Sequence, residues 1–257
     1  MLKADRQLGL LNILQGRTEA VRITELATLL HVTPMTVRRD VAELARQGRV
    51  LVTHGGVRLQ AETVSAETVY DLKLTEDRLE KDAIARAALA HVTDGMTLFL
   101  DGGTTVGALA PHLTSRRLTV ITNALNVVNV IARSRRVRLM VIGGTFRRES
   151  LTFLGPKAVS MLRELRYDIA FLGTEGFDWD RGFEVPDETD AEIKALAART
   201  AGTTIVLAAG SKLGRRFLCR FANWGMVDYL ITSERRDQDM PPVHQGTRIT
   251  WVHAENG

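Results

Sequence analysis

The sequence has one cysteine, Cys219, which excludes an intramolecular disulfide and offers no paired thiolates for a metal. Histidine is also sparse, and its positions lack the spacing of metal ligands. The six histidines are His31, His54, His91, His112, His244 and His253. We therefore expect neither a metal site nor another cofactor.

Long apolar runs are missing as well. Lys3, Asp5 and Arg6 interrupt the apolar start of the chain, so we expect no signal peptide. No run reaches the length of about 18 apolar residues that suggests a membrane-spanning helix. These absences predict a cytoplasmic protein, and 257 residues suffice for one large core and a small module.

The positive charge is concentrated near the N-terminus. Residues 1–60 hold 9 of the 34 Lys and Arg residues but 5 of the 30 Asp and Glu residues, which accounts for the whole net charge of +4. A local basic excess is typical of modules that bind nucleic acid through phosphates.

Within this basic segment, a helix is predicted to begin at Thr33. Its hydroxyl can cap the helix, and Pro34 suits the first helical position because the missing N–H has no partner there. Helical spacing places three apolar residues on one inward face: Val37, Val41 and Leu44.

The other side of this helix carries residues that suit a DNA major groove. We predict DNA contacts from Thr33, Pro34, Met35, Thr36, Arg38 and Arg39. An Arg can bind guanine through two hydrogen bonds, a Thr methyl can contact the thymine methyl, and a helix N-terminus attracts phosphate. An ordinary amphipathic helix with solvated arginines is the alternative.

The flanking sequence favours DNA binding. Thr24 is predicted to cap a short helix over 25–30, with Leu26, Leu29 and Leu30 at helical spacing, and a helix over 6–15 completes a trihelical core. Residues 31–32 can form only a turn.

Downstream, Gly48 is predicted to end the helix, and residues 49–59 read as two strands joined by a glycine turn. The expected fold is a winged helix-turn-helix over 3–58, with Thr53, His54 and Arg58 on the wing near the phosphate backbone.

A polar connector over 59–75 separates this module from a domain over 76–235, which is expected to begin with a helix over 76–91. Apolar runs there alternate with helical stretches, such as 124–132, 156–165 and 191–200. The expected strands are 97–100, 118–121, 137–142, 168–172, 203–207 and 229–231. This alternation predicts an α/β fold with a mainly parallel sheet covered on both faces.

Ligands of such sheets bind at the carboxyl ends of the strands, where this sequence places loops rich in Gly and Thr. Backbone N–H groups beside glycines and hydroxyls at helix N-termini bind anions. The predicted effector residues are Asp101, Gly102, Gly103, Thr104, Thr105, Thr122, Asn123, Gly143, Gly144, Glu175, Lys194 and Lys212. These loops favour a small, polar, phosphorylated ligand.

The helix-turn-helix, the Val32–Asp40 string, the wing ending in His54-Gly55-Gly56 and the strand-end loops together resemble the DeoR family of bacterial transcriptional regulators. The resemblance implies a homo-oligomeric repressor of a carbohydrate-utilisation operon that a phosphorylated sugar releases from operator DNA. It also implies a C-terminal domain similar in fold to ribose-5-phosphate isomerase. The family's phosphate loop falls on residues 101–105, and its Ser-Lys motif on Ser211-Lys212.

The sequence departs from the family at two positions: Ala209 replaces an Asp, and Asp190 replaces a Glu. These changes alter the carboxylates available to bind sugar hydroxyls. Glu175 or Asp187 could bind those hydroxyls instead. A sugar-phosphate isomerase with a fused DNA module is the alternative function, using Glu175 or Asp190 with Lys194. A winged helix used for protein contacts is less favoured. Within the C-terminal extension over 236–257, residues 248–252 fit a further strand.

Overall fold

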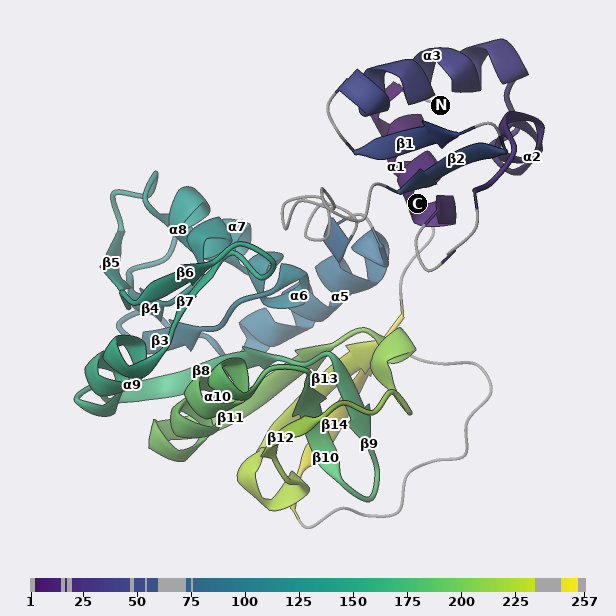
Figure 1. Cartoon of the computed structure of the whole chain (residues 1–257). Helices are drawn as coiled ribbons and strands as arrows, with labels where there is room; N and C mark the ends of the chain where they lie inside the picture. Colours follow the sequence, from purple (N-terminus) through teal and green to yellow (C-terminus); the bar gives the residue numbers. More distant parts are fainter. Residues whose placement is uncertain are drawn as a thin grey trace. The chain divides into compact units, whose positions relative to one another are not determined.

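The computed structural model describes residues 3–14, 17, 20–46, 49–53, 55–59, 73–74, 76–233 and 246–253. The chain divides into two compact units, Met1–Glu76 and Asp77–Gly257 (Figure 1). Most of the predicted connector, together with the helix end expected at Gly48 and the wing residue His54, lies outside the described residues.

The first unit is a winged helix-turn-helix, as predicted. Its elements are α1 (Lys3–Leu14), α2 (Ile23–Leu29), α3 (Pro34–Arg46), β1 (Val50–Thr53) and β2 (Gly56–Leu59). The strands form an antiparallel hairpin, and a bridge between Val21 and Val57 joins it to the segment before α2. Apolar side chains from every element meet in one core, which includes Leu11, Leu26 and Leu44.

The second helix differs from its prediction. It begins at Ile23, two residues earlier than expected, so Thr24 lies within the first turn and does not cap the helix. Leu26 and Leu30 are buried as expected, but Leu29 is 47% exposed. Residues 26 and 30 are four positions apart and share the inward face, whereas position 29 points between that face and solvent.

A buried ion pair that the sequence analysis did not anticipate joins α1 to α3. Arg6 donates from Nε to Asp40 Oδ2 over 2.5 Å and from Nη2 to Oδ1 over 3.1 Å. The Asp40 side chain is 1% exposed. Two parallel hydrogen bonds fix the relative orientation of the helices, so this pair sets the angle at which α3 is presented.

The second unit is built on a seven-stranded sheet in the order β14-β13-β11-β8-β3-β4-β5. Every neighbouring pair in it is parallel. The strands are β3 (Thr97–Leu100), β4 (Leu118–Thr122), β5 (Val137–Val141), β8 (Tyr167–Gly173), β11 (Ala201–Ala208), β13 (Tyr229–Ser233) and β14 (Arg248–Val252). The α/β prediction is confirmed, including the further strand over 248–252.

Helices cover both faces of this sheet (Figure 1). One face packs on α5 (Arg78–Ala88), α6 (Thr104–Gly107), α7 (Ala110–Leu113) and α8 (Leu125–Ile131). The other packs on α9 (Pro156–Arg163) and α10 (Glu188–Thr200). Alternation divides each strand between the two cores, as Leu98 and Phe99 show.

Short elements outside the main sheet were not predicted. They are the hairpin β6 (Thr145–Arg147) and β7 (Thr152–Leu154), the sheet of β9 (Gly176–Asp178), β10 (Gly182–Val185) and β12 (Cys219–Ala222), and the 3-10 turns η1 (Leu89–His91), η2 (Gly210–Lys212) and η3 (Trp224–Met226). Runs of three or four residues are too short to show a period, so the sequence pattern does not reveal them. Among the described residues, no helix is both long and apolar enough to cross a bilayer.

The pair between Arg6 and Asp40 generates a stability prediction. Arg6→Ala leaves a buried carboxylate without its partner and should lower the free energy of unfolding of the first unit by about 2 kcal/mol. Urea unfolding, followed by circular dichroism, measures the change. Lys3→Ala is the matched control, because Lys3 pairs with Glu43 on the same two helices but is 56% exposed and should change stability much less. Equal effects of the two variants would contradict a structural role for Arg6.

Candidate functional site

The start of α3 has the predicted capping geometry. The Thr36 N–H donates to Thr33 Oγ1 over 3.3 Å, and α3 begins at Pro34. The two threonine hydroxyls lie 2.9 Å apart, so they also share a hydrogen bond. The first turn of the helix is therefore held in place by its own side chains, before any ligand binds.

The outward side of α3 is open to solvent. Met35 is 64% exposed, and Arg38 and Arg39 are exposed beside it, whereas Val37 and Val41 are buried in the core. Two guanidinium groups and a flexible apolar side chain thus project from the N-terminal half of a capped helix. This is a surface that can enter a major groove.

The wing offers both charge and apolar surface. Arg58 is exposed on β2 and pairs in register with Leu51 on β1, while the Thr53 hydroxyl donates to the Gly56 carbonyl over 3.3 Å. Val52 is 55% exposed, a feature that the sequence analysis missed. Gly56 has φ +144°, and a Cβ there would lie 2.2 Å from the Val21 carbonyl oxygen, so only glycine fits.

In the second unit, the predicted loops line up along one edge. Parallel strands end on the same side of the sheet, so strand order fixes loop order. Along the edge from β11 to β5 come the loops 209–212, 173–175, 101–105, 122–123 and 143–144. The structure thus brings together residues that are more than a hundred positions apart in the chain.

A buried ion pair stands at the centre of this edge. Lys194, from α10, donates to Asp101 Oδ2 and to the Gly173 carbonyl, the latter over 3.3 Å. Asp101 Oδ2 also accepts the Gly173 N–H over 2.9 Å. The Lys194 charge is therefore shared within the protein, and the pair locks α10 to the ends of β3 and β8.

Asp190 lies one turn before Lys194, with its Oδ1 atom 3.7 Å from Nζ. Burial raises the pKa of Asp190 to about 6, and the charges of Asp101 and Glu175 add to the effect although Lys194 opposes it. Burial alone would lower the pKa of Lys194, but Asp101 and Asp190 raise it above its ordinary value. Lys194 is therefore charged, and Asp190, with a pKa of about 6, loses its proton at a pH well above the range usual for an Asp.

The loop 101–105 combines close packing with an open backbone. A Cβ on Gly102 would lie 2.3 Å from Thr152 Cγ2, whereas Gly103, with φ +103°, has no neighbour within 4 Å of its Cβ position. Thr104 is buried and Thr105 half-buried in the first turn of α6. First-turn N–H groups have no partner inside their own helix, which leaves them for an anion.

The next loops are largely internal. Thr122 is fully buried, and its hydroxyl donates to the Leu100 carbonyl over 2.7 Å. Asn123 donates to the Phe153 carbonyl. Asn126, which was not among the predicted site residues, donates to the Gly103 carbonyl over 3.2 Å. It therefore stabilises the loop 101–105. Gly143 and Gly144 follow β5, where a Cβ on Gly144 would lie 2.5 Å from the Leu154 carbonyl oxygen.

The loop 209–212 is hydrogen-bonded to residues at the start of the second unit. Lys212 Nζ lies 3.3 Å from Glu175 Oε2. Ser211 donates to Asp77 Oδ2 over 2.8 Å, and the Ser233 hydroxyl bridges Glu80 and the Gly210 N–H at 2.6 and 2.7 Å. Asp77 immediately precedes α5, so the edge that holds the predicted effector residues is bonded to the first helix of the unit.

Among the residues that the structure describes, no group of three or more His, Cys, Asp or Glu side chains could hold a metal ion. The polar groups that converge at this edge are backbone amides, amide and carboxylate oxygens, and paired lysines.

Known families match both units. The DeoR-like helix-turn-helix domain matches residues 6–63, and the DeoR C terminal sensor domain matches residues 76–234. With the geometry of α3 and the wing, these matches define a DNA-binding transcriptional regulator with a sensor domain. The chain belongs to the DeoR family, as the sequence resemblance indicated.

Full-length relatives agree. The chain is 30% identical over 254 residues to the transcriptional regulator GlpR of Haloferax volcanii, covering 98% of both chains. It is also 30% identical to the glycerol-3-phosphate regulon repressor of Escherichia coli strain K12, covering 98% of this chain and 97% of that one. The L-fucose operon activator of the same strain is 28% identical, covering 91% and 97%. These relatives are regulators, which favours that function over the isomerase alternative.

Ribose 5-phosphate isomerase A of Methanocaldococcus jannaschii is among the similar solved structures. It is 19% identical, with 54% of this chain and 55% of that chain covered and a TM-score of 0.39. A score at this level carries no argument about function.

The raised pKa of Asp190 generates a pH prediction. As the pH rises from about 4, the unfolded chain loses its proton first, so the folded state loses stability until Asp190 itself ionises near pH 6. Relative to wild type, Asp190→Asn should therefore gain stability across this window, by about 2–3 kcal/mol above it. Urea unfolding at a series of pH values measures this, and parallel profiles for both proteins would contradict the shift.

Proposed function

We propose that this protein is a repressor of a carbohydrate-utilisation operon that leaves its operator when a phosphorylated sugar binds the carboxyl edge of the sheet in the second unit. The observation that carries the proposal is the hydrogen-bonded path from the loop 209–212 to Asp77 and Glu80 at the start of α5. It joins the predicted effector loops to the part of the second unit that follows the DNA-binding unit in the chain.

The phosphate is assigned to the loop 101–105. The first turn of α6 presents backbone N–H groups, and the open position at Gly103 lets a large anion approach them. Lys194 is not needed as a direct partner, since it already neutralises Asp101. Lys212, half-buried and paired with Glu175, is the cation that can exchange its partner for a phosphate.

The sugar is assigned to buried acceptors beside that loop. Three buried oxygens have no hydrogen-bond partner among the described residues: Asp101 Oδ1, Asn123 Oδ1 and Asn126 Oδ1. An unsatisfied buried acceptor costs about 1–3 kcal/mol, and sugar hydroxyls are donors that can relieve this cost. Ala209 is fully buried and brings no polar group, so hydroxyl recognition shifts toward these oxygens and Asp190.

The hydrogen bond from Ser211 to Asp77, just before α5, is proposed to couple effector binding to release from the operator. Asp77 adopts φ +53°, a left-handed conformation that is uncommon outside glycine, and its side chain binds Ser211 and does not cap its own helix. A sugar phosphate that draws Lys212 toward itself moves the adjacent Ser211 and releases Asp77. A ligand acts in this way only if it binds the two states with different affinity.

The oligomer and the location follow from the DNA target. We infer a homo-oligomer, dimer or tetramer, whose paired recognition helices meet half-sites about one helical turn or a multiple of it apart. As a regulator that binds operator DNA, it is expected to act in the cytoplasm. Among the relatives are a glycerol-3-phosphate regulon repressor and an operon activator, so the repressor assignment is the part that a reporter assay must test.

The first test compares two arginines on DNA from the protein's own upstream region and on random duplex. Arg39→Gln should cost about 1–3 kcal/mol on the operator alone, because a base-reading contact is lost. Arg58→Gln should weaken both duplexes alike and lower the salt dependence by about one counterion. Fluorescence anisotropy at several salt concentrations measures both, and identical behaviour of the two variants would place α3 outside the groove.

The second test separates binding from release, using a panel of sugar phosphates and the corresponding free sugars. Thr104→Val should weaken effector binding while leaving operator affinity unchanged, because it removes a donor from the loop 101–105. Ser211→Ala should bind effector within a few-fold of wild type by calorimetry. It should bind the operator about tenfold more weakly without any effector, because Asp77 is already released, and tenfold lies within the usual range of coupling. Ser160→Ala, exposed on α9, is the control. Wild-type operator affinity of Ser211→Ala without effector would refute the path through Asp77.

A further inference from the structure

The charge of the second unit is strongly segregated along the sequence. Residues 102–148 contain eight arginines and no Lys, Asp or Glu. Because residues 61–257 are neutral overall, the rest of that segment carries a matching excess of eight acidic residues. A count over the whole domain hides this basic stretch.

Six of these arginines gather at one end of the sheet. They occupy the turn before β4, the turn before β5 and the start of β5 itself, and we call them the arginine edge: Arg116, Arg117, Arg133, Arg135, Arg136 and Arg138. Since β4 and β5 are parallel neighbours, both turns lie at the amino end of the sheet. The arginine edge is therefore opposite the loops assigned to the effector.

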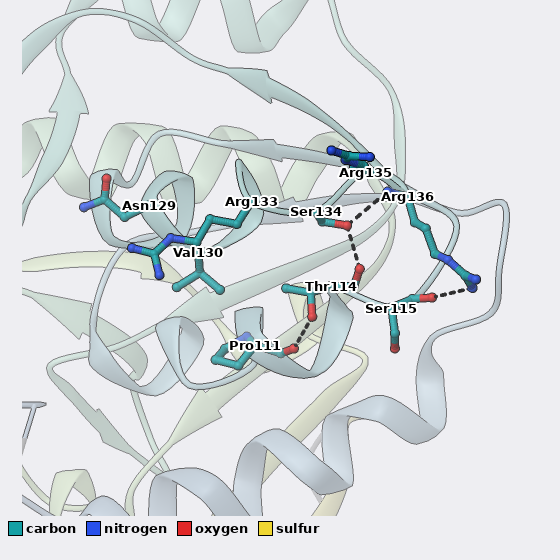
Figure 2. A pocket seen from close by; sticks show the side chains of 9 residues that line it. All are labelled: Pro111, Thr114, Ser115, Asn129, Val130, Arg133, Ser134, Arg135 and Arg136. Carbon is teal, nitrogen blue, oxygen red and sulfur yellow. Dashed lines mark hydrogen bonds between the residues drawn. The ribbon is translucent and has the colours of Figure 1, made fainter.

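A hollow of about 650 Å³ lies between the two turns. The residues that line it include Thr114, Ser115, Ser134, Arg133, Arg135 and Arg136 (Figure 2). Ser134 holds the turn: its hydroxyl donates to the Thr114 carbonyl over 2.6 Å and accepts the Arg136 N–H over 3.1 Å. The backbone that carries Arg133, Arg135 and Arg136 is therefore held in place by hydrogen bonds.

The guanidinium groups do not converge on one point. Figure 2 shows the side chains of Arg133 and Arg136 extending in opposite directions from the turn, and Arg136 donates to the Ser115 carbonyl over 3.2 Å. All three arginines of this turn are exposed. Spread charges of this kind match a row of phosphates better than one compact anion.

Nearby carboxylates account for only part of the arginine edge, because one Asp lies beside two of its arginines. Asp94 lies 3.8 Å from Arg116 and 3.6 Å from Arg117. Among the described residues, the ion pairs within 4 Å include none for Arg133, Arg135 or Arg136. Complementing the carbonyl end of α8 would need one cation, and this turn supplies three.

We infer that the arginine edge binds the phosphate backbone of duplex DNA beside the operator. Arg suits this contact because its planar group can bind a phosphate through two hydrogen bonds. The helix-turn-helix of the same chain holds the protein on DNA, which raises the local concentration of flanking phosphates for a second, weaker site. The contact reads no bases and depends on neither the effector nor the operator sequence.

The test uses the full chain and a triple variant, Arg133→Gln, Arg135→Gln and Arg136→Gln. The control carries Arg163→Gln, Arg166→Gln and Arg199→Gln, which remove three exposed arginines from α9, the turn after it and α10. Anisotropy is measured on the footprinted operator, on the operator extended by about two helical turns on each side, and on random duplexes of both lengths.

Wild type and control should bind the long duplexes about tenfold or more tightly than the short ones, while the triple variant should lose that gain. Its salt slope on long DNA should fall by about 2–3, one counterion for each lost phosphate contact. Equal affinities and slopes for all three proteins would overturn the inference. So would a triple variant that binds DNA normally but dissociates in sedimentation, since the edge would then bind an acidic surface of a second copy.

Discussion

The carboxyl edge of the parallel sheet in the second unit depends on one buried ion pair, Lys194 with Asp101. Two opposite charges in a nearly dry site are stable only while their geometry and hydrogen bonds remain intact, and here the Gly173 backbone completes both sides. The pair joins α10, β3 and β8, which are distant in the chain. The loops that begin at Asp101 and Gly173 are positioned by this pair, and the first of them leads into the turn of α6 that carries Thr104.

Because Lys194 is occupied, the proposed recognition at this edge uses dipolar groups together with Lys212. In this proposal, backbone amides of the first turn of α6 bind the phosphate, and buried amide and carboxylate oxygens accept hydrogen bonds from the sugar hydroxyls. Asp190 adds a charge that depends on pH. The same edge is bonded through Ser211 and Ser233 to the start of α5, so the predicted effector loop 209–212 and the beginning of the unit are joined by hydrogen bonds.

The sequence predicted what repeats with a period and missed what depends on single contacts. The seven parallel strands and the cap at Thr33 followed from apolar patterning and turn chemistry. The pairs Arg6 with Asp40 and Lys194 with Asp101 join residues far apart in the chain, so no local pattern marks them. The supporting role of Asn126 was missed for the same reason, whereas the small antiparallel sheets were missed because their strands are too short to show a period, and Leu29 because it lies at the margin of the inward helix face. The arginine-rich stretch over 102–148 is visible in the sequence, but a net charge taken over all of residues 61–257 conceals it.

The parallel sheet also separates stability from ligand choice. Side chains within the strands alternate between two cores, as Leu98 and Phe99 do, and a change there disturbs packing on one face. Loops at the carboxyl edge add few large apolar side chains to either core, although several of their residues are buried. A lineage can therefore exchange residues such as Ala209 or Asp190 and acquire a new inducer without first acquiring a new fold. Diversification of the family's ligands is accordingly expected in the loops, with the strands kept as a common frame.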